Sequence, residues 1–122
     1  MAIVPQAPKI NTSIVYVRTF IHYFFHFGFP LIVTYGFFRS DWKKVYLIFL
    51  ATMLVDLDHL LADPIFDPNR CSIGFHPLHS YYAMAFYPVF LFLKKPINYI
   101  GLGLVMHMLT DSLDCFLMRW WG

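Results

Sequence analysis

Histidines and aspartates carry most of the chemistry that this chain could perform. Three pairs of them lie three or four residues apart, a spacing that places both side chains on one face of a helix. The pairs are His22 with His26, Asp56 with His59, and His107 with Asp111. Imidazole nitrogens and carboxylate oxygens are the ligands that zinc and other divalent ions take from proteins. The pattern therefore predicts a metal site assembled from several helices.

The candidate ligands outnumber the four that one tetrahedral ion needs. The strongest are His26, Asp56, His107 and Asp111, followed by His59, His76 and His79, with His22 as a further candidate. Two ions about 3.5–4 Å apart would use this set more fully than one. We therefore expect one or two divalent ions, zinc first, with manganese, magnesium or iron as alternatives.

Two further residues have candidate catalytic roles. Asp58 lies about 200° around a regular helix from Asp56. If the helix unwinds there, Asp58 could act as a general base or as a ligand of a second ion. Arg70 could hold a phosphate or an oxyanion through its planar guanidinium.

Composition indicates which elements must position these side chains. The 122 residues are 59% hydrophobic and only 13% charged, whereas soluble domains carry about 25% charged residues. Four apolar segments cover approximately 14–38, 45–61, 78–93 and 97–118. The first and fourth reach the length of about 20 residues that spans a bilayer as a helix. We expect an all-α fold, an integral membrane four-helix bundle formed by residues 14–122 after a 1–13 tail.

The histidines and aspartates fall at one height in such a bundle. With a rise of about 1.5 Å per residue, His26, Asp56 and His107 lie about 15–18 Å from the inner ends of their helices. Each ionisable group buried in a bilayer costs about 2.5–3.5 kcal/mol on insertion scales. A cation would offset that cost, so we predict a polar metal site in the outer half. A buried polar network without metal is the alternative.

Charge and cysteines bear on topology and partners. Basic residues cluster at 38–44 and at Lys94 and Lys95, which favours the cytoplasm for these two loops. The site would then face outward. A net charge of +2 without a basic stripe gives no reason to expect nucleic acid. Cys71 and Cys115 could form one bond or remain free thiols. No cleavable signal peptide is evident, so the first segment should remain a helix.

Three runs of residues resemble one known family. Residues 55–59 (VDLDH), 74–80 (GFHPLHS) and 107–111 (HMLTD) occur in that order after an early helical histidine, His22 or His26. Together they resemble the YdjM-like membrane-bound metal-dependent hydrolases, over about residues 20–115. The loop is one residue shorter between its histidines than in that family, and the chain lacks extra helices. The resemblance implies a small protein of the bacterial inner membrane with a metal-dependent hydrolase site.

Three functions follow from these observations. The first is a hydrolase acting on membrane lipid or a phosphoester at the membrane–water boundary. The second is a membrane di-iron oxidoreductase, although the chain has no further histidine cluster and carries aspartates instead. The third is a non-enzymatic subunit that handles metal or protons, but the apolar inner half of each helix opposes a path through the membrane. Whether the chain forms a homo-oligomer is left open.

Overall fold

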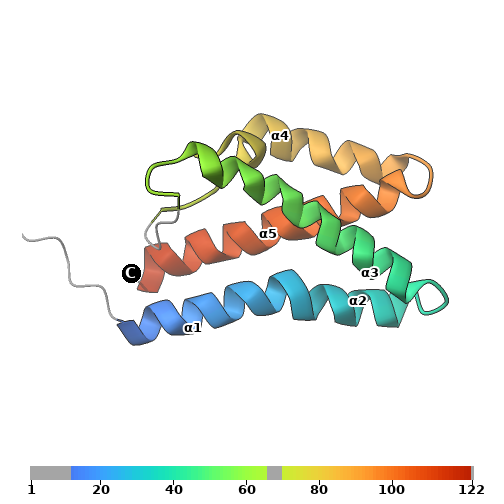
Figure 1. Ribbon diagram of the computed structural model, residues 1–122, viewed down its shortest axis with the longest axis horizontal. Helices are drawn as coiled ribbons and strands as arrows, with labels where there is room; N and C mark the ends of the chain where they lie inside the picture. Colours follow the sequence, from blue (N-terminus) through green and yellow to red (C-terminus); the bar gives the residue numbers. More distant parts are fainter. Residues whose placement is uncertain (1–11, 66–69, 122) are drawn as a thin grey trace, which may run out of the picture.

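The computed structural model describes residues 12–65 and 70–121, so most of the predicted 1–13 tail lies outside the described residues. These residues form four helical rods that pack together, and the described residues contain no strand (Figure 1). The rods are α1–η1–α2 (Thr12–Tyr23, Phe24–Gly28, Phe29–Phe37), α3–η2 (Trp42–Ala51, Thr52–Leu61), α4–η4 (Tyr81–Phe86, Tyr87–Phe92) and α5 (Ile97–Trp121). The prediction of an all-α fold with four helices is confirmed.

The third rod begins later than the sequence indicated. Residues Pro77–His79 form a separate 3₁₀ turn, η3, and α4 begins only at Tyr81. The Ser80 side chain accepts a hydrogen bond from the backbone N–H of Ala83 at 3.3 Å, which caps the helix and fixes its first residue. His79 therefore lies in a turn that precedes the helix.

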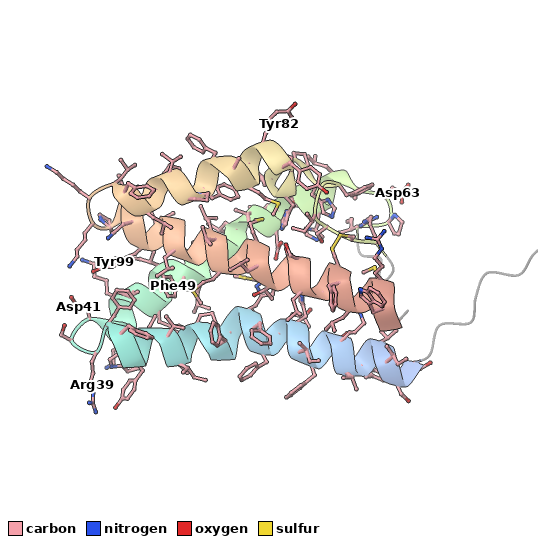
Figure 2. The ribbon with its side chains drawn as sticks, turned by 180° about the vertical axis from the view of Figure 1, so that it is seen from behind. Arg39, Asp41, Phe49, Asp63, Tyr82 and Tyr99 are labelled. Atoms are coloured by element: carbon pink, nitrogen blue, oxygen red, sulfur yellow. A yellow bond between two sulfur atoms is a disulfide. The ribbon has the colours of Figure 1, made fainter. Side chains whose placement is uncertain are left out.

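The two ends of the bundle differ in chemistry. The α2–α3 turn and the η4–α5 turn lie at the same end, and the segment after η2 lies at the opposite end with the start of α1 and the end of α5 (Figure 1). Figure 2 shows Arg39 and Asp41 at the first end and Asp63 at the second. The two lysine- and arginine-containing turns thus share one end, as the four-helix topology predicts.

Burial is inverted relative to a water-soluble domain. Among the described residues, six hydrophobic side chains are buried against ten polar or charged ones. Large apolar side chains cover the outside instead, for example Phe20, Phe37, Leu61 and Tyr82, and Figure 2 shows Tyr82 directed away from the bundle. Two helices, Thr12–Phe37 and Ile97–Trp120, are long and apolar enough to cross a membrane. Exposed apolar surface of this extent is typical of sites that contact a membrane or another protein.

Two glycines let α5 approach its neighbours closely. A Cβ on Gly101 would lie 2.6 Å from Cβ of Phe90, and one on Gly103 would lie 2.8 Å from Cγ2 of Thr52. Small residues at such helix contacts allow the two backbones to pack closely. Since Gly103 precedes His107 by four residues on the same helix, this contact also sets the distance between His107 and η2.

Candidate metal centre

Four ligand atoms from three parts of the chain converge inside the bundle. They are Oδ1 of Asp56 in η2, Nε2 of His79 in η3, and Nε2 of His107 and Oδ2 of Asp111 in α5. Nε2 of His79 lies 2.8 Å from Asp111, 3.2 Å from His107 and 3.3 Å from Asp56. Nε2 of His107 lies 3.1 Å from Asp56 and 3.2 Å from Asp111. We call these four residues the primary cluster.

The local geometry of η2 explains how Asp56 and Asp58 both contribute. The segment Thr52–Leu61 is a 3₁₀ helix rather than an α-helix, with about 3.0 residues per turn. Asp56 faces His79 and His107 of the primary cluster. Asp58 instead reaches the other edge of the His79 ring, where its Oδ2 lies 2.9 Å from Nδ1 and also accepts the backbone N–H of Leu78 at 2.9 Å.

A metal ion would satisfy the primary cluster more fully than hydrogen bonds do. Nδ1 of His79 donates to Asp58, which leaves Nε2 as the nitrogen that faces Asp56, Asp111 and His107. A single proton on that nitrogen can bond well to one close partner, whereas two carboxylate oxygens and one imidazole nitrogen lie within 3.3 Å. A cation at the centre would be attractive to all four atoms at once.

Five separations among the four atoms are compatible with a metal coordination sphere. Ligand atoms about 2.0–2.1 Å from a tetrahedral ion lie about 3.3–3.4 Å apart, and adjacent ligands of an octahedral ion lie about 2.9 Å apart. The observed separations run from 2.8 to 3.3 Å. The buried residues could therefore hold a metal ion, and both coordination geometries are compatible with these separations.

Asp111 connects the primary cluster to a second group on α1 and η1. Its Oδ1 atom lies 3.0 Å from Nε2 of His26 and 3.7 Å from Nε2 of His22. The two imidazole rings meet edge to face, with centroids 4.3 Å apart. The first rod thus supplies two histidines whose rings face Oδ1 of Asp111. We call His22, His26 and Oδ1 of Asp111 the secondary group.

A third group, Asp58, His59 and His76, is held mainly by hydrogen bonds and ring contacts. Nδ1 of His59 lies 3.0 Å from the carbonyl oxygen of Asp56 and 3.2 Å from Oδ1 of Asp58. Ser72 Oγ lies 3.4 Å from Nε2 of His59. The His59 and His76 rings overlap with centroids 3.9 Å apart. Both nitrogens of His59 thus have partners.

The two loop histidines, which lie outside the two candidate membrane helices, differ in protonation. Burial, assisted by the neighbouring His59, lowers the pKa of His76 and keeps it neutral. Burial alone would also lower the pKa of His79, but hydrogen bonds with Asp111, Asp56 and Asp58 outweigh it and raise that pKa to about 10. Without a metal, a proton on His79 would therefore balance part of the carboxylate charge.

A cavity of about 100 Å³ adjoins the secondary and third groups. It is lined by His22, His59 and His76 and by two arginines, Arg18 and Arg70. Arg18 is buried in α1 and its Nη2 lies 3.4 Å from both carboxylate oxygens of Asp114. In the sequence, Arg18 is a charged residue within an apolar segment. That is the only sequence signal that could have identified it as part of the cavity.

A disulfide joins Cys71 to Cys115 beside this cavity. It ties the segment that carries Ser72 and His76 to α5, next to Asp114. The sequence left a bond and two free thiols equally open, and the structure selects the bond.

The structure brings some of the predicted site residues together and keeps others apart. Asp56, His107 and Asp111 lie together, as the sequence predicted. The fourth member of the primary cluster is His79, whereas the expected fourth residue, His26, contacts the other carboxylate oxygen of Asp111. Asp58 orients His79 rather than joining the four ligand atoms. Arg70 does not contact the primary cluster: it donates to the carbonyl oxygen of Ile65 at 3.0 Å and lies over the Phe75 ring. Sequence spacing could not foresee these loop positions.

Comparison with protein families gives a match over most of the chain. Residues 16–118 match a family described as a family of unknown function, DUF6122. No curated protein and no solved structure matches the chain. Because the match covers most of the 122 residues, the chain belongs to the DUF6122 family.

Proposed function

We propose that this chain is an integral membrane metal-dependent hydrolase that acts on a lipid or phosphoester at the membrane–water boundary. The observation that carries the proposal is the convergence of the four primary ligand atoms, with His79 oriented from behind by Asp58. Carboxylates that orient metal-binding histidines in this way are a regular feature of metal sites. The resemblance of the three motifs to the YdjM-like hydrolases points to the same chemistry.

The membrane location rests on the apolar exterior. The two candidate membrane helices have only 17% and 39% of their apolar windows buried, whereas the core helix of a soluble protein would be mostly buried. We take lipid to be the partner of this surface. We place the metal end outward, in a bacterial inner membrane, because the basic turns lie at the other end and because disulfides persist in oxidising compartments.

The cavity suits a substrate that carries negative charge. Arg18 and Arg70 contribute two cationic side chains to its lining, against one carboxylate from Asp114. A divalent ion lowers the pKa of a bound water to about 7, which supplies a nucleophile at neutral pH. Zinc is the ion that we expect first, with manganese, magnesium or iron as alternatives.

Metal analysis combined with a hydrolysis assay tests the proposal. Protein purified in detergent without chelator should carry a divalent ion and cleave bis(p-nitrophenyl) phosphate or phospholipid in mixed micelles. Chelation should abolish the cleavage, and the metal should restore it. His107→Ala and Asp111→Ala should each lose metal and activity together, because each removes a ligand from the primary cluster.

Asp41→Asn provides a matched control, since Asp41 lies at the opposite end of the bundle, and it should retain both metal and activity. Full metal occupancy in His107→Ala or Asp111→Ala would remove that residue from the ligand set. Bound iron with near-ultraviolet absorbance and no hydrolysis would favour the di-iron oxidoreductase. A metal-free protein of unchanged stability would favour a non-enzymatic subunit.

A further inference from the structure

We propose that the secondary group binds a second metal ion, with Asp111 bridging the two ions through its two carboxylate oxygens. This inference rests on the proposed metal binding of the primary cluster and adds the position at which substrate would bind. The ligands of the second ion would be Nε2 of His22, Nε2 of His26 and Oδ1 of Asp111.

The contacts of Asp111 divide cleanly between its two oxygens. Oδ2 faces His79 at 2.8 Å and His107 at 3.2 Å, while Oδ1 faces His26 at 3.0 Å. Asp111 is buried, so neither oxygen is turned toward bulk solvent. A carboxylate with imidazole nitrogens gathered at each oxygen is arranged as a bridging ligand, and paired ions about 3.5–4 Å apart are common in hydrolytic sites.

His22 distinguishes a second ion from a simple hydrogen bond. A hydrogen bond to Oδ1 accounts for the position of His26, but Nε2 of His22 lies 3.7 Å from the same atom, beyond hydrogen-bond reach. The other nitrogen, Nδ1, is buried and has no hydrogen-bond partner in the part of the chain that the structure describes, so no hydrogen bond at that nitrogen fixes the orientation of the ring. An ion beside Oδ1 would use Nε2 of His22 as a ligand and so explain why its ring is turned toward Asp111.

The backbone around His26 is also irregular. Residues Phe24–Gly28 form a π-helical turn, in which the N–H of Phe29 bonds to the carbonyl oxygen of Phe24. Such single π-helical turns inside α-helices are frequent at functional sites. His26 is the polar residue of this turn and is itself buried.

The two proposed ion positions differ in how accessible they are to substrate. The primary cluster has four protein ligands, and three of them are almost fully buried. The secondary group offers three ligands, and His22 also lines the cavity. Catalytic metal sites keep a position open for water or substrate, and the three-ligand secondary group leaves such a position beside the cavity. The second ion would therefore be the one that meets substrate.

Buried charge agrees with two ions. Asp56, Asp58 and Asp111 bring three carboxylates to the site, so one divalent ion leaves it negative. A second divalent ion removes that excess and would favour an anionic substrate such as a phosphoester in the cavity.

Metal stoichiometry tests this inference directly. Chelator-stripped wild-type protein in detergent would be titrated with Zn²⁺ and its bound metal measured by mass spectrometry after desalting. We expect two ions per chain in the wild type and one in His22→Ala and in His26→Ala. The matched control is Thr19→Ala, which changes the same helix and the same cavity without removing a ligand, and it should keep two ions.

The outcomes separate this inference from the proposed function. One ion in the wild type and an unchanged count in His22→Ala would overturn the second site and leave the primary cluster intact. Two ions in both proteins would show that His22 is no ligand and would also overturn the assignment. Two ions without hydrolysis would contradict the hydrolase proposal alone.

A second measurement covers the case in which the alanine variants do not fold. Mn²⁺-loaded wild-type protein should give the electron paramagnetic resonance spectrum of a coupled pair, because both ions share Asp111. A spectrum of isolated Mn²⁺ at full loading would contradict a bridged pair.

Discussion

Oδ2 of Asp58 lies 2.9 Å from Nδ1 of His79, and this contact determines which nitrogen of the ring faces the other three ligands. Both side chains are almost fully buried, so water cannot replace either partner. Asp58 joins the end of the second rod to the turn before the third, and the ligand position of His79 depends on it.

Replacement of Asp58 by asparagine should therefore weaken metal binding without removing a ligand. The amide can still contact His79, but it no longer supplies the negative charge that raises the basicity of the ring. Loss of such an orienting partner costs about 10–100-fold in metal affinity. Competition with a chromophoric chelator would measure the change. Asp41→Asn is the control, and equal affinities in the two variants would show that the Asp58 contact is unimportant.

Close packing at Gly103 predicts that a single methyl group will disturb the site. In Gly103→Ala the new Cβ would meet Thr52, which should push α5 away from η2 and separate His107 from Asp56. Overpacking of this kind costs about 1–3 kcal/mol. Thermal unfolding in detergent and metal affinity should both decline.

Gly36→Ala is the matched control for this change, because nothing lies within 4 Å of a Cβ at that position. Alanine is favoured over glycine in a helix interior by about 1 kcal/mol, so this variant should be as stable as the wild type or more so. Equal stability of the two alanine variants would mean that the α5–η2 contact does not position the site.

Stabilisation by metal should increase with pH. The pKa of His79 in the folded, metal-free protein is raised to about 10 from 6.5. Its proton therefore stabilises the metal-free fold fully below about pH 6.5, and this contribution is lost as pH rises toward 10. A metal ion must displace the same proton, so its affinity increases over that range. The difference in Tm with and without Zn²⁺ should grow between pH 6 and pH 8, and a difference that shrinks would exclude His79 as a ligand.

The Cys71–Cys115 disulfide should stabilise the end of the bundle that holds the site. Removal of a native disulfide commonly costs about 2–4 kcal/mol. The double variant Cys71→Ser with Cys115→Ser should unfold at a lower temperature and bind metal more weakly, since the segment that carries His76 and His79 loses its tie to α5. A reductant should lower the Tm of the wild type and leave the double variant unchanged. No effect of reductant on the wild type would contradict the prediction.

Helical periodicity predicted the parts of the site that lie on regular helices. The spacing of His107 and Asp111 placed both on one face of α5, and apolar length predicted four helices. The third helix begins at Tyr81, later than apolar length alone predicted, because Ser80 caps it. Sequence spacing ranks His79 behind His26 as a candidate ligand, although His79 lies in the primary cluster.

Loop-borne contacts are the part that sequence could not supply. Asp58 of the 3₁₀ helix η2 meets His79 because the Pro77–His79 turn lies against that helix. Pairing of Arg18 with Asp114 and of Cys71 with Cys115 likewise depends on contacts between distant segments. Spacing along one helix says which side chains share a face, but it does not say which faces meet.

The most direct test of metal binding at the primary cluster is an anomalous difference map, recorded at the absorption edge of the ion that copurifies with the protein. We expect a peak among Oδ1 of Asp56, Nε2 of His79, Nε2 of His107 and Oδ2 of Asp111, about 2.0–2.2 Å from each atom. Well-ordered side chains with no peak at that position, in crystals grown with the metal at saturating concentration, would contradict the account.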